Sequence, residues 1–149
     1  MILTSGNEIA IRLAQIADID AIKQLADAHR HELGFLRRPA LLEAIGRQEL
    51  LVAQNRMGII GFVEYRHRRD QQTTLYNVVV HPDHRGQGTG HKLVLELEKE
   101  AQQKDKLWVL LKCPEDLPAN SFYQRIGYTQ IAEERGKSRR LYIWRKTLA

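Results

Sequence analysis

The hydrophobic positions along the chain follow two spacings, one typical of β-strands and one typical of α-helices. Polar and apolar residues alternate over residues 8–13, which predicts a first strand. Behind it, apolar residues recur at the spacing of one helical face, at Ile19, Ile22, Leu25 and Ala26. This pattern predicts a helix that Asp18 caps and that ends near Leu33, with Gly34 as the C-terminal stop.

The centre of the chain predicts a second helix and then a hairpin. Pro39 stands where the first turn of a helix tolerates proline, and the helical segment ALLEAIGR follows it. Residues 50–54 and 59–67 predict two antiparallel strands around a tight turn at residues 55–58. Residues 74–80 predict one more strand.

The second half of the chain adds two helices and three strands. Residues 91–103 carry an apolar stripe opposite charged residues, which predicts an amphipathic helix. Residues 107–112, LWVLLK, are too apolar for an edge strand and predict a buried one. A short helix over residues 119–126 should end at Gly127, and the segments YTQIAE and RRLYIWRKTL predict two closing strands.

The predicted order of elements is βααβββαβαββ, which indicates a mixed α/β fold. The chain has 149 residues, of which 43% are hydrophobic, enough to bury one sizeable core. No internal repeat or low-complexity linker interrupts the pattern, so residues 1–149 are expected to form a single domain.

The composition of the chain indicates in which cellular compartment the protein is expected. No apolar run approaches the roughly 18 residues of a membrane span, so no membrane partner is expected. The start MILTSGNEIAIRLAQ lacks the order of a secretory signal, and the single cysteine, Cys113, agrees with a reducing, cytoplasmic location. The spacing of the six histidines completes no ligand set, so no metal site is expected.

The formal net charge of +5 allows three interpretations: a solvated basic rim, an anionic cofactor or a nucleic-acid partner. The basic residues cluster as RHRR at 66–69 and as RGKSRR at 135–140. Both runs lack interleaved aromatic residues that would stack on bases, which disfavours a nucleic-acid partner.

The densest chemical signal is the stretch VVVHPDHRGQGTGHK from Val78 to Lys92. A glycine-rich turn between a strand and a helix leaves free N–H groups that converge on an anion, and the helix dipole adds about half a positive charge. The stretch therefore predicts a phosphate-binding turn. The Walker A pattern fails, because no Gly-Lys-Ser/Thr stands at the required distance, and the dinucleotide pattern GxGxxG meets His91 at its last glycine.

The spacing of Arg85, Gly88 and Gly90 resembles the acyl-CoA pyrophosphate loop of the GNAT superfamily of N-acetyltransferases. The segment SFYQRIGY at 121–128 is similar to the Phe-Tyr-x-x-x-Gly-Phe segment of the same superfamily, and the order of strands and helices also matches. The resemblance implies a splayed, mixed and mostly antiparallel sheet of about seven strands flanked by about four helices.

The resemblance also implies acetyl-CoA as co-substrate. Pantetheine would bond to backbone groups of the strand that ends at Val80, where a β-bulge would polarise the thioester carbonyl. The loop N–H groups would wrap the pyrophosphate. Many members carry asparagine seven residues before the tyrosine of SFYQRIGY, where this chain has Asp116. The implied cofactor contacts are Val78, Val79, Val80, Arg85, Gly86, Gln87, Gly88, Thr89, Gly90 and, in place of that asparagine, Asn120.

Tyr123 matches the tyrosine that protonates the departing thiolate in many members of the superfamily. A phenol, with a reference pKa of about 10, keeps its proton at neutral pH and can act as a general acid. The alternative interpretation is that Phe122 and Tyr123 only pack the helix onto the sheet.

An amine acceptor must lose a proton before it attacks, because it is mostly an ammonium ion at neutral pH. Glu64 is the candidate general base, acting directly or through water, and Tyr76 and Glu115 are alternatives. Cys113 next to Pro114 invites covalent catalysis, which is disfavoured because no histidine is placed by the sequence to activate the thiol.

The sequence thus predicts direct transfer of an acetyl group from acetyl-CoA to a primary amine, on a small molecule or a protein. A GNAT-like CoA-binding module without catalysis and a basic nucleic-acid-binding protein are the alternatives. The basic residues at 29–38 and 136–140 would favour an acceptor with a nearby negative group over a polycation. A monomer and a homodimer are both compatible with the sequence.

Overall fold

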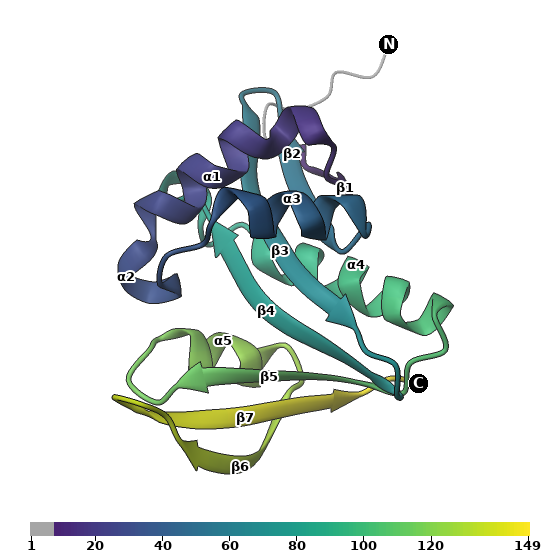
Figure 1. Cartoon of the computed structure of the whole chain (residues 1–149), viewed down its shortest axis with the longest axis vertical. Helices are drawn as coiled ribbons and strands as arrows, with labels where there is room; N and C mark the ends of the chain where they lie inside the picture. Colours follow the sequence, from purple (N-terminus) through teal and green to yellow (C-terminus); the bar gives the residue numbers. More distant parts are fainter. Residues whose placement is uncertain (1–7) are drawn as a thin grey trace. The chain divides into compact units, whose positions relative to one another are not determined.

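The computed structural model describes residues 8–149, which form a seven-stranded sheet and five α-helices (Figure 1). The strands are β1 (Ala10–Leu13), β2 (Leu50–Asn55), β3 (Gly58–His67), β4 (Gln72–Val80), β5 (Trp108–Pro114), β6 (Thr129–Arg135) and β7 (Arg140–Thr147). The helices are α1 (Ile19–Ala28), α2 (Arg30–Leu33), α3 (Arg38–Gly46), α4 (Thr89–Gln103) and α5 (Ala119–Arg125), with 3-10 turns η1 (Ile16–Asp18) and η2 (Pro82–His84). The predicted mixed α/β class is confirmed.

The strands are ordered β1-β2-β3-β4-β5-β7-β6 across the sheet. The pairs β1–β2, β2–β3, β5–β7 and β6–β7 are antiparallel, and the pair β4–β5 is parallel. The mostly antiparallel mixed sheet is therefore confirmed. Since β5 lies between β4 and β7 and buries Val109, Leu111 and Cys113, the prediction of a buried strand at residues 107–112 is also confirmed.

Two compact units divide the chain. The first comprises the residues up to Tyr65 together with Asn77–Leu97, and the second comprises Arg66–Tyr76 and Glu98–Ala149. Strand β4 and helix α4 each contribute residues to both units. That residues 1–149 act as one domain stays a prediction.

The core of the first unit is an apolar layer between helices α1 and α3 and strands β2 and β3, and Figure 1 shows the two helices next to each other. The helical spacing of the apolar residues in α1 brings Ile22 and Leu25 to one side. Val79 joins the same core and so anchors the end of β4. The buried cluster consists of Ala14, Ile19, Ile22, Leu25, Ala26, Leu41, Ala44, Ile45, Leu50, Val52, Phe62 and Val79.

Asp18 occupies the N-cap position of α1, as predicted, but its side chain does not cap the helix. Its carboxylate accepts hydrogen bonds from the backbone N–H of Gln15 at 2.8 Å and from the Arg12 guanidinium at 2.8 and 3.0 Å, and it makes no side-chain cap bond to α1. Asp18 therefore closes the turn η1 that precedes the helix. The Arg12 guanidinium, on β1, holds the carboxylate there.

The first predicted helix is divided at His29, so the described residues hold five helices where about four were expected. The His29 ring donates through Nδ1 to the Leu25 carbonyl at 2.8 Å, and the His29 backbone N–H bonds to Ala26 at 3.1 Å instead. The ring thus takes the acceptor that the next α-helical bond would use. Gly34, with φ of +75°, ends α2 as predicted.

The remaining elements are confirmed with boundaries that differ by a few residues. The largest consequence concerns α4, which begins at Thr89 rather than at residue 91, so Thr89 and Gly90 belong to its first turn. Register shifts lie in β2, between Ala53 and Gln54, and in β6, between Gln130 and Ala132. The β-bulge expected within residues 74–80 is not tested by these pairings and stays a prediction.

The second unit contains β5, β6 and β7 together with α5. Leu111 lies opposite Trp144 in the β5–β7 pair, and Trp144 is buried. The helix α5 ends at Arg125, and Gly127 follows with φ of +100°, as the predicted helix stop requires. The turn brings the backbone N–H of Tyr128 to the Tyr123 carbonyl at 3.0 Å.

Across residues 8–149, no helix is both long and apolar enough to cross a membrane. Residues 1–7, the start of the segment MILTSGNEIAIRLAQ, lie outside the described residues, so the prediction that this segment is no secretory signal is not tested there.

Candidate functional site

The turn between β4 and α4 is held at its start by hydrogen bonds within the first unit. The His81 N–H donates to the Ile60 carbonyl on β3 at 2.7 Å, and the His81 ring accepts from the Asp83 N–H at 3.1 Å. Arg85 folds back, so that its Nε donates to the Val80 carbonyl at 3.1 Å. These contacts define where the chain leaves β4 and where it enters the glycine-rich part.

Gly86 and Gly88 both adopt left-handed backbone conformations, with φ of +78° and +81°. A Cβ added to either residue would meet no atom within 4 Å. Backbone conformation, and not lack of space, therefore requires glycine at both positions. The empty surroundings leave the turn open to an approaching group.

The first turn of α4 has unsatisfied donors. The Lys92 N–H makes the first helical bond, to the Gly88 carbonyl at 3.0 Å. Among the described residues, the backbone N–H groups from Gly86 to His91 have no acceptor. The Thr89 hydroxyl is also without a partner in this range, although Thr89 is only 2% exposed. A buried hydroxyl without a partner costs about 1–3 kcal/mol, so these donors together indicate a site for an anion.

Gly61 on β3 supports the end of β4. A Cβ at Gly61 would lie 2.7 Å from the Val79 carbonyl oxygen and 3.3 Å from Leu93 of α4. Only a residue without a side chain lets β3 approach the backbone of Val79 and Val80, and lets Leu93 approach β3, this closely. Gly61 is not among the predicted site residues, although the sequence shows it as a lone glycine within the apolar strand IIGFVEY.

Glu64, the predicted base, lies on β3 opposite Leu50 of β2. Its carboxylate accepts a hydrogen bond from the Asn77 amide at 2.8 Å. Burial raises the pKa of Glu64 above its usual range, although the Asn77 bond and the charge of Arg47 act in the opposite direction. A carboxylate with a raised pKa is a stronger base, which suits proton removal near neutral pH.

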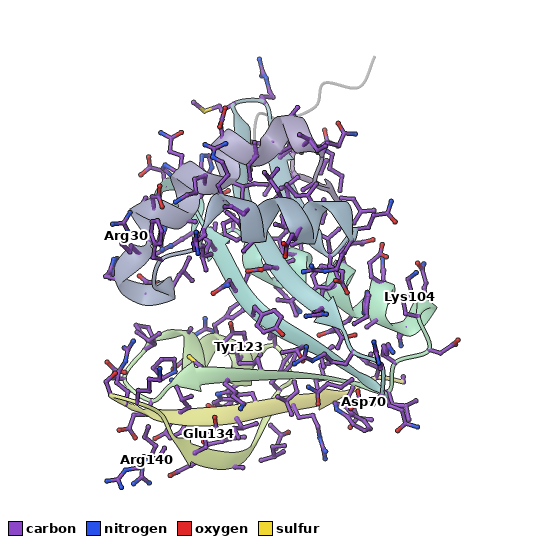
Figure 2. The ribbon with its side chains drawn as sticks, viewed as in Figure 1. Arg30, Asp70, Lys104, Tyr123, Glu134 and Arg140 are labelled. Atoms are coloured by element: carbon purple, nitrogen blue, oxygen red, sulfur yellow. The ribbon has the colours of Figure 1, made fainter. Side chains whose placement is uncertain are left out.

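Tyr123, the predicted acid, comes from α5 in the second unit and is labelled in Figure 2. It is only 5% exposed, and its ring packs at 5.3 Å from the Phe122 ring and at 6.1 Å from the Tyr128 ring. Burial raises the pKa of its phenol, and the neighbouring Cys113 adds to this effect. Within the described residues of its own unit, the phenol oxygen has no hydrogen-bond partner. The phenol is therefore protonated and available as a donor.

Cys113 is buried in the second unit as a free thiol. Burial, and then the nearby Asp116 carboxylate, raise the pKa of the thiol to about 11. The thiolate is the nucleophilic form of cysteine, so a thiol that keeps its proton at neutral pH is a poor nucleophile. This agrees with the interpretation that Cys113 takes no covalent part.

Asn120, the predicted substitute for the family asparagine, uses both ends of its amide within the second unit. Its nitrogen donates to the carbonyls of Pro114 at 2.8 Å and Leu117 at 3.0 Å, and its oxygen accepts from the Trp144 indole at 2.9 Å. Asn120 thus ties the start of α5 to the end of β5 and to β7. Asp116, at the family position, is paired with Arg139 at 3.3 Å.

Several of the basic residues in the predicted acceptor segments are paired with carboxylates. Arg38 contacts Asp20 at 2.8 Å in the first unit, and Arg140 contacts Glu133 at 2.6 Å in the second. The outer position of Arg140 can be followed in Figure 2. These pairings neutralise part of the positive charge on which the predicted acceptor preference rests.

A family model of the acetyltransferase (GNAT) domain matches residues 46–130. The chain belongs to the GNAT acetyltransferase family. The matched range runs from the end of α3 into β6, so it includes the turn between β4 and α4, Glu64 and Tyr123. The resemblance to the GNAT superfamily seen in the sequence is confirmed.

Relatives of this GNAT chain support the assignment. An uncharacterized N-acetyltransferase, ycf52, of Gracilaria tenuistipitata var. liui is 28% identical over 103 residues, which are 64% of this chain and 56% of the relative. The match therefore spans little more than half the length of that relative. Among solved structures, Ard1 of Thermoplasma volcanium has the same fold, with a TM-score of 0.84 at 18% identity over 95% of this chain and 98% of its own. Rv2747 of Mycobacterium tuberculosis, solved with CoA and NLQ, has a TM-score of 0.74 at 26% identity, and the match covers 87% of this chain and 76% of that one.

Proposed function

We propose that the protein is an acetyl-CoA-dependent N-acetyltransferase that transfers the acetyl group directly to a primary amine. The observation that carries this proposal is the gathering of unpaired backbone N–H groups and a buried, unpartnered Thr89 hydroxyl at the start of α4. Family membership and the CoA-bound relative support the same co-substrate.

The residues of the turn fit a pyrophosphate. Backbone N–H groups of Gly86, Gln87, Gly88, Thr89 and Gly90 would donate to the phosphate oxygens, because no other acceptor among the described residues uses them. The positive end of the α4 dipole and the charge of Arg85 would add to the attraction. The open space above both left-handed glycines would leave room for the phosphates.

Backbone groups of Val78, Val79 and Val80 would hold the pantetheine arm. Val79 is anchored in the core of the first unit, and the missing side chain of Gly61 allows the close approach of β3. A fixed strand is useful here, because preorganised hydrogen-bond donors stabilise the negative charge that develops on the thioester oxygen.

Acetyl-CoA, when bound, supplies a thioester whose carbonyl carbon accepts the amine and whose sulfur leaves as a thiolate. Glu64 would take the proton from the ammonium form of the acceptor, directly or through water, and its raised pKa suits this role. The C–N bond forms and the C–S bond breaks. Tyr123 would donate its phenol proton to the leaving sulfur, and the second proton of the attacking nitrogen would return to the Tyr123 phenolate through solvent, so protons and charges balance.

We also propose that residues 1–149 act as one cytoplasmic N-acetyltransferase domain on a small-molecule or protein amine. The buried Cys113 thiol is compatible with a reducing compartment. The two amide N–H groups of Asn120 donate to Pro114 and Leu117, so a cofactor contact would use the second lone pair of its oxygen, beside the bond from Trp144. Its first role is therefore to hold the start of α5.

The test is an acceptor screen with acetyl-CoA against protein N-termini, lysine peptides, amino acids, polyamines, aminoglycosides and aminoacyl-tRNA. Release of the CoA thiol and the mass of the acetylated product are measured together. We expect one acceptor class to gain a single acetyl group with stoichiometric thiol release. Tight acetyl-CoA binding without turnover on any class would contradict catalysis and support a CoA-binding module instead.

A further inference from the structure

A cluster in the second unit, formed by the buried Glu98 and Tyr128 and the half-buried Lys146, has no part in the proposed chemistry. Glu98 is on α4, Tyr128 directly precedes β6 and Lys146 is on β7. The Tyr128 hydroxyl donates to Glu98 Oε2 at 2.9 Å, and the Lys146 ammonium donates to Glu98 Oε1 at 3.0 Å. Glu98 is only 7% exposed and Tyr128 only 3%. Residues far apart in the sequence thus meet at one carboxylate.

Hydrogen bonds and an ion pair within the cluster fix the position of the Tyr128 ring. A buried carboxylate is tolerated only when it is paired and hydrogen-bonded, and here each oxygen of Glu98 has its own donor. Lys146 also donates to the Ile126 carbonyl at 3.4 Å and lies 5.9 Å from the centre of the Tyr128 ring. The hydroxyl end of Tyr128 is therefore anchored to α4 and β7.

The fixed Tyr128 ring packs against Tyr123. The two ring centres are 6.1 Å apart with an angle of 63° between the planes, which is a favourable edge-to-face contact. The backbone N–H of Tyr128 also donates to the Tyr123 carbonyl at 3.0 Å. Since the Tyr123 phenol has no hydrogen bond within its described unit, ring packing decides where its oxygen lies.

We infer that Glu98 is a positioning residue for Tyr123: by holding the hydroxyl of Tyr128 it fixes the ring against which the Tyr123 ring is oriented. This inference rests on the proposed role of Tyr123 as the acid. Glu98 touches neither acetyl-CoA nor the acceptor in this scheme and acts only through Tyr128. A purely structural cluster would change the stability of the fold and leave the orientation of Tyr123, and hence turnover, unchanged.

Two conservative variants separate positioning from stability. Glu98→Gln keeps the size of the side chain but removes its charge. One amide oxygen then replaces the two oxygens that accept from Tyr128 and Lys146. Tyr128→Phe keeps the ring and removes only its anchoring hydroxyl, and it replaces Glu98→Gln if that variant does not fold. We expect kcat to fall about tenfold in both variants, with the KM for acetyl-CoA unchanged, because a small displacement of a reacting group is costly.

Asp18→Asn is the matched control. Asp18 also forms a partly buried ion pair, with Arg12 at 2.8 Å, and it lies in the first unit, whereas Tyr123 belongs to the second. Asp18→Asn should lower the melting temperature measured by circular dichroism and keep the wild-type kcat. A similar fall of kcat in this control would show that lost stability, and not positioning, lowers turnover, and would overturn the inference.

The deciding experiment is a double-mutant cycle on kcat with Glu98→Gln, Tyr123→Phe and both together. If Glu98 acts through Tyr123, the tenfold loss expected for Glu98→Gln should nearly vanish in the Tyr123→Phe background. Equal losses in both backgrounds, or a wild-type kcat in Glu98→Gln, would overturn the inference and leave the acid role intact. A wild-type kcat in Tyr123→Phe alone would overturn the acid role, and the positioning inference with it.

Discussion

The turn at residues 81–91 and the segment at residues 119–128 build their chemistry in opposite ways. The turn offers backbone N–H groups, and side-chain identity matters where φ is positive, at Gly86 and Gly88. The segment of Tyr123 depends on one phenol and on the side chains packed around it. A backbone site is encoded by adjacent residues and a side-chain site by distant ones, so the two regions should respond differently to substitution.

The largest effect is expected for Tyr123→Phe, which tests the side-chain region. Phenylalanine keeps the ring packing and removes the only proton that the side chain can donate. We expect kcat to fall by about 10²-fold with little change in acetyl-CoA affinity, because a thiolate leaves tolerably well without an acid. Steady-state kinetics with the acceptor found in the screen measures both. Tyr142→Phe, on β7, is the control and should keep the wild-type kcat. A Tyr123→Phe enzyme with normal kcat would mean that the residue only packs.

The second prediction tests the backbone region through Gly61. Alanine there would place its Cβ 2.7 Å from the Val79 carbonyl oxygen, so we expect Gly61→Ala to destabilise the fold by about 1–3 kcal/mol. Gly46→Ala is the control, because nothing lies within 4 Å of an added Cβ at that position. That change should be neutral or stabilise by up to about 1 kcal/mol. Urea unfolding measures both, and equal stabilities of the two variants would show that β4 is not held by close approach.

Most elements could be predicted from periodicity, and the glycine-rich turn between β4 and α4 could be predicted from neighbouring residues, since strand, glycines and helix are contiguous in the chain. The division of the first helix at His29 could not, because it depends on a ring that competes for one helical acceptor. Glu98 and Lys146 could not be predicted either: they lie 30 residues before and 18 after Tyr128 and meet only in the folded unit. Gly61 had a signal in the sequence, but nothing there indicates which backbone it approaches.

The smallest of these effects is expected for Glu64→Gln, which shows whether the first unit contributes a side chain as well as a backbone. We expect kcat/KM to fall about tenfold near neutral pH, since glutamine cannot take a proton. Burial raises the pKa of Glu64, so the wild-type kcat/KM should fall as the pH drops through this raised value, which lies above the usual carboxyl range. The pH profile of kcat/KM for the variant should lack this fall. An unchanged profile would assign the base elsewhere.

The same raised pKa makes a prediction on stability. Because the folded pKa of Glu64 lies above its unfolded value, the contribution of Glu64 to stability is fully present below the unfolded pKa. It is lost as the pH rises through the folded pKa. The stability of the wild type relative to Glu64→Gln should therefore decrease with rising pH across that window, and urea unfolding at several pH values measures it. An increase with pH would contradict the direction of the shift.

The central claim is that acetyl-CoA binds with its pyrophosphate on the turn before α4, and calorimetric titration of acetyl-CoA into Gly88→Val tests it most directly. Gly34→Val is the matched control: the two glycines have φ of +81° and +75°, and neither has an atom within 4 Å of an added Cβ. Both substitutions therefore force a β-branched residue into a positive φ. We expect Gly88→Val to weaken acetyl-CoA binding by more than about tenfold, through loss of charge-assisted bonds to the phosphates, while Gly34→Val keeps the wild-type dissociation constant. Equal dissociation constants in the folded wild type, Gly88→Val and Gly34→Val would contradict the claim.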